Sequence, residues 1–195
     1  MIGGTGTIGS AVVQELAKHH EVLTASYEKS DLQVDITDNH SIEKMYRTAG
    51  KVDAVVLTTG KVHFGPLVDF QPEQFQVGLN NKLMGQVNVV MAGLHHLNDH
   101  GSFTLTSGIL NHDPIRYGVS ASMVNGALDG FVKSAAIEMP RGIRINVVSP
   151  TIIQEAMGKY ADYFRGFNPQ PAARVALAYS KSVNGAQTGQ IYTVW

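Results

Sequence analysis

The chain has 195 residues, of which 44% are hydrophobic, and its 15 Lys and Arg side chains nearly balance its 16 Asp and Glu side chains. The formal net charge of −1 excludes the strongly basic surface with which proteins bind nucleic acids and anionic membranes. The absence of cysteine excludes disulfides, thiolate nucleophiles and cysteine-ligated metals. No apolar run is long enough to span a membrane, and no signal peptide precedes the first motif. We therefore expect one cytoplasmic domain that covers residues 1–195.

The first motif is a glycine-rich stretch at the start of the chain, in which Gly3, Gly6 and Gly9 recur every three residues. An apolar pattern of helical period follows it. Glycine lets the backbone turn sharply and approach a ligand, and the N-terminus of a helix presents free N–H groups to a phosphate. A nucleoside triphosphate loop needs a lysine directly after its last glycine, where this chain has Ser10. The motif therefore predicts a dinucleotide site, and the alternative is a flexible glycine turn.

After this loop the chain alternates between short apolar strands and helical segments. A dinucleotide fold normally begins with a strand of about five residues, whereas only Met1 and Ile2 precede the loop here. Either the first few residues are lacking or the sheet is built with a short stub. Strands are predicted at residues 21–25, 32–35, 52–58, 102–106, 143–149 and 189–194. Helices are predicted directly after the glycine loop and at residues 41–49, 72–97 (with a break near Gly85), 120–139, 154–164 and 171–181.

This alternation predicts an α/β fold, namely a Rossmann-like doubly wound parallel sheet with helices on both faces. With the truncated first strand counted, the expected strand order is 3-2-1-4-5-6-7. Ligands bind such sheets at the carboxyl ends of the strands, so the loops that leave this edge are expected to face one cleft. Those loops are residues 3–9, 35–38, 58–65, 107–117 and 150–154.

Motifs along nearly the whole chain resemble those of the short-chain dehydrogenase/reductase family. They are the glycine loop, Val34-Asp35-Ile36-Thr37-Asp38, Leu57-Thr58-Thr59-Gly60, Ser107, and residues 142–150 with the sequence GIRINVVSP. The resemblance makes Asp35 the acceptor for the adenine amino group, a role that suits a carboxylate; the alternative is a helix cap. The cofactor-binding residues that the resemblance implies are Gly3, Thr5, Gly6, Thr7, Ile8, Gly9, Ser26, Asp35, Ile36, Thr59, Gly60, Pro150 and Thr151.

The catalytic residues of that family are only partly present. Ser107 matches the serine that hydrogen-bonds the substrate oxygen, but the Tyr-x-x-x-Lys pair falls at Ala121 and Asn125. That pair works because the lysine ammonium lowers the phenol pKa on one helical face. Tyr117, one helical turn earlier, and Lys82, where the family has an asparagine, are candidates for a relocated phenol and ammonium. The alternative is that Tyr117 packs in a turn and Lys82 is a solvated helix charge.

The choice of cofactor depends on the end of the second strand, where an acidic side chain accepts from the ribose hydroxyls of NAD. That position is Ser26 here, and Ser26 with Lys29 tolerates a 2′-phosphate, so NADP is favoured over NAD; Glu28, if turned inward, would oppose it. No metal is expected, because His96 and His100 have helical i, i+4 spacing but no cysteine or acidic partner at suitable spacing.

Two functions follow from these patterns. The first is an NADP(H)-dependent oxidoreductase that acts on a small carbonyl or alcohol substrate. Ser107 would orient the substrate, Tyr117 or a loop histidine (His63 or His112) would donate the proton, and Lys82 would supply the relocated ammonium. The alternative is a non-catalytic NAD(P)-binding sensor or scaffold. The apolar helical segments 72–97 and 120–139 predict a homodimer or homotetramer.

Overall fold

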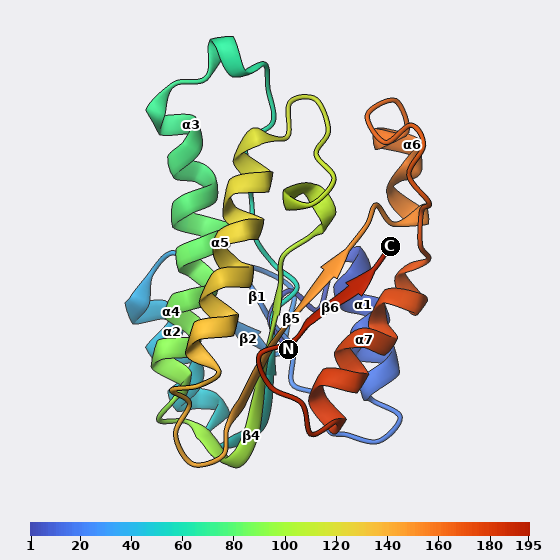
Figure 1. Ribbon diagram of the computed structural model, residues 1–195. Coiled ribbons are helices and arrows are strands. Elements are labelled where there is room, and N and C mark those ends of the chain that lie inside the picture. The colour runs from blue at the N-terminus through green and yellow to red at the C-terminus, as the bar shows by residue number, and fades with distance from the viewer.

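The computed structural model describes residues 1–195 and has a parallel β-sheet between two layers of helices (Figure 1). All strand pairs are parallel, and the strands form one pair, β1-β2, and one four-stranded set in the order β3-β4-β5-β6. The strands are β1 (Ala25–Ser26), β2 (Leu32–Gln33), β3 (Val52–Val56), β4 (Leu97–Thr106), β5 (Arg144–Pro150) and β6 (Ile191–Val194).

Ile2 joins these two parts of the sheet. It makes parallel bridges to Ala25 on one side and to Leu57 on the other, and it is almost fully buried. Backbone hydrogen bonds run from the Ile2 N–H to the Val56 carbonyl (2.8 Å) and from the Gly3 N–H to the Ala25 carbonyl (2.9 Å). With Ile2 counted as the first strand, the predicted order 3-2-1-4-5-6-7 is confirmed.

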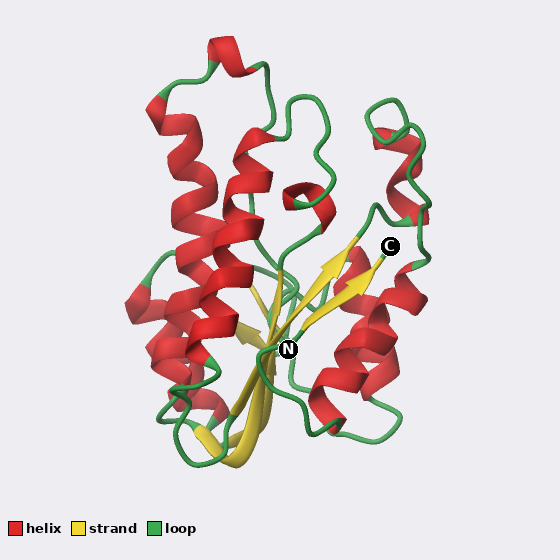
Figure 2. Ribbon diagram, in the orientation of Figure 1, coloured by secondary structure: helices red, strands yellow, loops and turns green.

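The helices cover both faces of this sheet (Figure 2). On one face α1 and α7 pack together, and Val12, Val175 and Tyr179 form a buried cluster with strand residues. On the other face α2, α4 and α5 contribute to the larger core cluster. The helices are α1 (Thr7–Leu16), α2 (Asn39–Ala49), α3 (Pro72–Val77), α4 (Met84–Gly93), α5 (Val119–Ala135), α6 (Met157–Tyr160) and α7 (Ala172–Asn184). Shorter turns are η1 (Leu67–Asp69), η2 (Gly78–Leu83), η3 (Ile109–Asn111) and η4 (Gln154–Ala156), of which η2 is a π-helix.

The structure differs from the sequence prediction in the long helical segment 72–97. The break is the π-helix η2, which precedes Gly85. Gly85 itself is a close-packing position, because a Cβ there would lie 2.7 Å from Ile36 Cδ1. The helix ends at Gly93, where a Cβ would lie 2.8 Å from the Phe103 ring, and β4 begins at Leu97.

Several other elements are shorter than predicted. The strand expected at 21–25 is reduced to Ala25–Ser26 and the one at 32–35 to Leu32–Gln33. The helix expected at 120–139 ends at Ala135, and the one at 154–164 is a 3₁₀ turn followed by the four residues of α6. No helix has the length and apolar character needed to cross a membrane.

The glycine loop sets a strict steric condition on α1. A Cβ on Gly9 would lie 2.0 Å from the Gly3 carbonyl oxygen, which is a backbone atom and moves only with the loop. We predict that Gly9→Ala lowers the free energy of unfolding by about 1–3 kcal/mol, as overpacking does, and lowers Tm by roughly 5 °C. Thermal unfolding followed by circular dichroism measures the shift. The control is Gly130→Ala on α5, where no atom lies within 4 Å of the added Cβ, so Tm is expected to stay or rise.

Candidate active site

Two neighbouring cavities open at the edge of the sheet where the strands end. The first has a volume of about 730 Å³ and is bordered by the loops that follow Ile2, β1, β2 and β3. The second, about 760 Å³, is bordered by the segments that follow β3, β4 and β5. Consecutive residues connect them, since Lys61 and Asn81 line the first cavity whereas Val62 and Lys82 line the second. The two cavities therefore form adjacent parts of one site.

Most of the predicted cofactor-binding residues line these cavities. The first contains Gly3, Thr5, Gly6, Ser26, Asp35, Ile36, Thr59 and Gly60. The second contains Ile8, Pro150 and Thr151. Thr7 and Gly9 line neither cavity; Thr7 is the first residue of α1, and Gly9 lets α1 pack against the loop.

The glycine loop forms a cradle for a phosphate. Gly3 has a φ of +82°, and a Cβ on it would lie 2.9 Å from the Thr58 carbonyl oxygen, so only glycine fits without strain. Gly6 precedes the first turn of α1, and no side chain caps the N–H groups of that turn. Free N–H groups at the start of a ten-residue helix favour an anion. The geometry fits the pyrophosphate of a dinucleotide.

Asp35 lies at the end of the first cavity with its charge stabilised locally. Its Oδ1 accepts hydrogen bonds from the Thr37 hydroxyl (2.7 Å) and the Thr37 N–H (2.9 Å). These hydrogen bonds lower the pKa of the carboxyl below its usual value, so it is ionised at neutral pH. The capping role that was the alternative belongs to Asp38, whose side chain accepts from the His40 N–H at the start of α2. An ionised carboxylate in this place fits the amino group of an adenine.

Ser26 uses its hydroxyl within its own loop. It donates to the Glu28 carbonyl and lies 3.0 Å from the Ser30 hydroxyl. Tyr27, which is 72% exposed, lines the cavity beside it, while Glu28 does not line the cavity. No carboxylate of this loop therefore faces the cavity at the position expected for the ribose.

Ser107 begins the loop after β4 and lines the second cavity with its side chain unpaired. Its N–H donates to the Val148 carbonyl at 3.0 Å, which continues the sheet, and its buried Oγ has no hydrogen-bond partner. Gln86 on α4 fixes the end of the strand, because its side-chain amide accepts from the Thr106 N–H (2.9 Å) and donates to the Thr106 carbonyl (3.0 Å). A rigid backbone thus holds a free hydroxyl at the cavity.

Lys82 reaches the same cavity from the π-helix η2. Its ammonium donates to the Ser107 carbonyl at 2.9 Å and to Asn125 Oδ1 at 2.7 Å (the Asn125 side chain comes from α5). Burial lowers the pKa of Lys82 to about 8, and the carboxylate of Asp129 opposes this shift. Relative to the resemblance, lysine and asparagine have exchanged helices while their side chains still meet. The reading of Lys82 as a solvated charge is wrong.

Tyr117 lines this cavity too, but it does not extend α5. The helix begins at Val119, and Tyr117 has a φ of +68° in the preceding turn. Its ring lies against Tyr163 (6.1 Å between centroids) and under the Arg116 guanidinium (5.3 Å). No hydrogen bond joins its phenol to Ser107 or Lys82, so the structure brings these three residues to one cavity but pairs only two of them.

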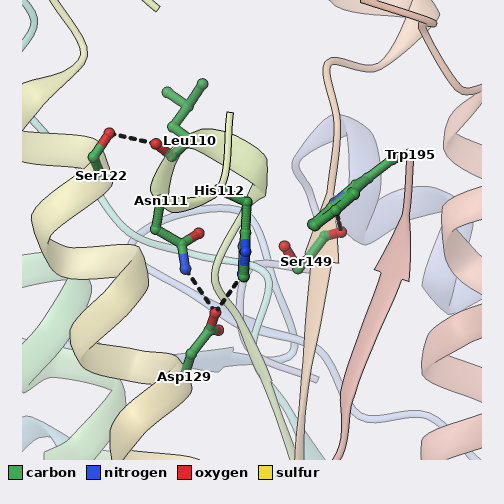
Figure 3. A network of polar contacts seen from close by, with 7 residues as sticks. All are labelled: Leu110, Asn111, His112, Ser122, Asp129, Ser149 and Trp195. Atoms are coloured by element: carbon green, nitrogen blue, oxygen red, sulfur yellow. Dashed lines mark hydrogen bonds and ion pairs between the residues drawn. The ribbon is translucent and has the colours of Figure 1, made fainter. Parts of the chain in front are cut away.

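Neither of the two loop histidines lines the cavity. His63 packs its ring against Phe70, at 5.2 Å between centroids. His112 lies 3.5 Å from Asp129 and packs against Trp195 (Figure 3). His96 stacks on Tyr46 at 5.0 Å, and no group of three or more His, Cys, Asp or Glu side chains is arranged to hold a metal ion.

A polar network that the sequence analysis missed fixes the loop after Ser107 (Figure 3). The buried carboxylate of Asp129 on α5 accepts from Asn111 Nδ2 at 2.8 Å, and Ser122 donates to the Leu110 carbonyl at 2.6 Å. On the other side the Trp195 indole donates to the Ser149 carbonyl at 2.9 Å. The only signal in the sequence was the spacing of Asp129, one helical turn after Asn125 on the same face.

Comparison with known proteins decides the family. A family model described as enoyl-(acyl carrier protein) reductase matches residues 4–189. The chain belongs to the short-chain dehydrogenase/reductase family. Within it, the chain is similar to the solved protein lin1944 from Listeria innocua, with 55% identity, a TM-score of 0.98 and coverage of 100% of this chain and 97% of that one.

Curated members of the family are more distant. The uncharacterized oxidoreductase YmfI of Bacillus subtilis is 30% identical over 65% of this chain and 54% of its own length. Carbonyl reductase [NADPH] 2 of Sus scrofa is 27% identical over 77% of this chain and 65% of its own length. The chain thus spans between about half and two thirds of these two relatives. A small-chain dehydrogenase solved with NADPH has the same fold (TM-score 0.85, 24% identity, covering 99% of this chain and 94% of that one).

The buried ammonium of Lys82 predicts a pH-dependent stability. The pKa of Lys82 is about 8 in the folded protein, against 10.5 for an unperturbed lysine, so the unfolded chain binds the proton more tightly. The charged Lys82 therefore destabilises the folded state to its full extent below pH 8, and this destabilisation is lost as the pH rises to about 10.5. Relative to Lys82→Met, the wild-type protein is therefore expected to gain stability between pH 8 and 10. Urea unfolding at several pH values measures the difference, and Lys133→Met, at an exposed position on α5, is expected to show no such trend.

Proposed function

We propose that the chain is an NADP(H)-dependent oxidoreductase that interconverts a small carbonyl compound and its alcohol. One observation carries the proposal: the unpaired hydroxyl of Ser107 and the ammonium of Lys82 line the same cavity, directly beside the phosphate cradle. When bound, the nicotinamide supplies or accepts a hydride. The residues of the chain then have to bind the substrate oxygen, stabilise its charge and move one proton.

Ser107 is proposed to hold the substrate oxygen. Its Oγ is buried and has no partner within the protein, so a ligand oxygen satisfies it. Because the Ser107 N–H is bound to Val148 and the preceding Thr106 to Gln86, the hydroxyl needs little reorganisation when the substrate binds.

Lys82 is proposed to stabilise the developing alkoxide and to supply its proton. An ammonium has three N–H groups, and two of them already donate to the Ser107 carbonyl and to Asn125. The third is free for the substrate. A pKa of about 8 lets this lysine give up and regain a proton near neutral pH. The phenol of Tyr117 is the second candidate for the donor, because it lines the same cavity.

NADP(H) is the proposed cofactor, for two reasons. No acidic side chain of the β1 loop faces the first cavity, so nothing there repels a 2′-phosphate. Among similar proteins, carbonyl reductase [NADPH] 2 has this cofactor in its name, and a small-chain dehydrogenase of the same fold was solved with NADPH. The unpaired hydroxyl of Thr151, at the second cavity, suits the amide of the nicotinamide.

The protein is proposed to form a homodimer or homotetramer in the cytoplasm. Large apolar side chains stay exposed on the segments 72–97 and 120–139: Val77 on α3, Met84 and Met91 on α4, Met123 on α5 and Ile137 in the turn after α5. Exposed apolar side chains on neighbouring helices are typical of an interface between copies. Light scattering after size-exclusion chromatography measures the assembly.

NADPH is expected to bind more tightly than NADH, and Asp35→Ala is expected to weaken NADPH binding by about tenfold, because a hydrogen bond to a charged group is lost. Quenching of the fluorescence of Trp195, the single tryptophan, measures both affinities. Asp69→Ala removes an exposed carboxylate outside both cavities and should leave the affinity unchanged. No binding of either cofactor would refute the assignment.

With NADPH and a panel of aldehydes, ketones and quinones, Ser107→Ala and Lys82→Met are each expected to lower kcat by about 10²- to 10⁴-fold, while cofactor binding persists. Oxidation of NADPH, followed at its absorbance maximum, measures the rate. Ser134→Ala, at an exposed position on α5, is the control.

Tyr117→Phe distinguishes the two candidate donors. If Lys82 supplies the proton, this variant keeps a rate within a few-fold of the wild type. A loss as large as that of Lys82→Met would assign the proton to the phenol instead. Binding of NADPH with no turnover of any carbonyl compound would contradict the oxidoreductase proposal and favour a sensor.

A further inference from the structure

The second cavity, called the substrate cavity from here on, has walls that are mostly apolar and aromatic. They come from three segments that follow different strands, so the cavity has apolar surface on several sides. Such walls favour a ligand with an apolar body, since burying each CH₂ group contributes about 0.8 kcal/mol. The walls include Phe64, Ile109, Leu110, Ile115, Tyr160 and Phe164.

The charged groups of the substrate cavity are all cations. Lys82 lies beside Ser107, whereas Arg116 and Lys159 are exposed side chains that also line the cavity. Arg116 comes from the loop after β4 and Lys159 from α6, two segments that are separate in Figure 1. No aspartate or glutamate lines the cavity. Its electrostatic potential therefore favours a negatively charged ligand.

Each of the two exposed cations lies over an aromatic ring. The Arg116 guanidinium lies 5.3 Å from the centre of the Tyr117 ring, and the Lys159 ammonium 5.2 Å from the centre of the Tyr160 ring. Such contacts restrict long side chains without neutralising their charge. The two cations are thus held near the aromatic walls and remain available for an anion.

The acidic side chains of the surrounding segments either have other partners or lie outside the cavity. Glu155 accepts from the Ala172 N–H at the start of α7, and Asp162 pairs with Arg165 at 2.9 Å. Asp129 is buried against Asn111. Asp113, in the loop after β4, is exposed but does not line the cavity. Neither Arg116 nor Lys159 forms an ion pair within the protein.

From these observations we infer that the substrate is an anionic carbonyl compound with an apolar body. Its carbonyl oxygen binds at Ser107 and Lys82, and an acidic group, such as a carboxylate, binds to Arg116 and Lys159. This inference rests on the proposed oxidoreductase function, and it adds the charge and the character of the substrate.

Three benzaldehydes of similar size test the inference: 4-formylbenzoate (anionic), 4-formylbenzamide (neutral) and 4-(trimethylammonio)benzaldehyde (cationic). With NADPH, kcat/KM is expected to be about tenfold higher for the anion than for the amide, since two partly exposed ion pairs each contribute a few-fold. The cation should be the poorest substrate. Because exposed ion pairs are screened, the preference for the anion is expected to shrink in 0.5 M NaCl.

Variants separate the charge of the cavity from the intrinsic reactivity of the aldehydes. Arg116→Gln and Lys159→Gln are each expected to lower kcat/KM for 4-formylbenzoate by about threefold, with the effect mainly in KM, and to change the value for 4-formylbenzamide by less than twofold. Arg116→Lys keeps the charge and should retain most of the preference. The matched control is Arg165→Gln. It removes a cation that lies near Lys159 in the sequence, pairs with Asp162 and does not line the cavity.

The outcomes are distinct. Equal kcat/KM for the anion and the amide, or equal losses for both in Arg116→Gln and Lys159→Gln, would overturn the inference while the oxidoreductase function stands. No reduction of any of the three aldehydes, nor of any member of the broader carbonyl panel, would instead refute the proposed function. A selective loss for the anion in the two variants, with Arg165→Gln unchanged, would support the inference.

Discussion

The sheet of this protein depends on backbone hydrogen bonds made by a very short segment, Met1 to Gly3. The β1-β2 pair and the four-stranded set do not contact each other as strands; Ile2 connects them, with Val56 and Thr58 on one side and Ala25 on the other. Since Gly3 continues directly into the glycine loop, the same bonds that close the sheet also position the phosphate cradle. The stability of the fold and the geometry of the binding site therefore have a common origin.

The candidate active site also depends on the contact between α5 and the π-helix η2. In a regular α-helix each residue advances the side chains by a fixed angle, and a π-turn inserts one additional residue and rotates those that follow. Lys82 lies in this turn, and its ammonium meets Asn125 and the Ser107 carbonyl. The family resemblance places an asparagine at position 82 and a lysine at position 125. Here the two residue types are exchanged, and their side chains form a hydrogen bond.

Sequence reasoning predicted the features that depend on local chemistry. The glycine loop, Asp35 and Ser107 were identified because their residue types and their places after strands restrict what they do. The strand order followed from the alternation of strands and helices, and it is confirmed even though the first strand is a single buried residue.

The features that sequence reasoning missed depend on contacts between distant segments. The helix α4 ends at Gly93, which packs closely against Phe103 and Tyr46, and an apolar helical period does not reveal this end. The sequence of the π-helix, GLNNKL, contains no residue type that distinguishes a π-helix from an α-helix. The contacts of Asp129 with Asn111 and of Trp195 with Ser149 join residues that are 18 and 46 positions apart, and no local pattern marks them.

The hydrogen bonds of Lys82 have a thermodynamic consequence for ligand binding. A free lysine side chain loses up to about 2 kcal/mol of rotamer entropy when it is immobilised. Here folding itself immobilises the ammonium, because the Ser107 carbonyl and Asn125 hold it in the protein without any ligand. The entropy loss therefore belongs to the folding equilibrium, and the substrate meets a donor that is already oriented.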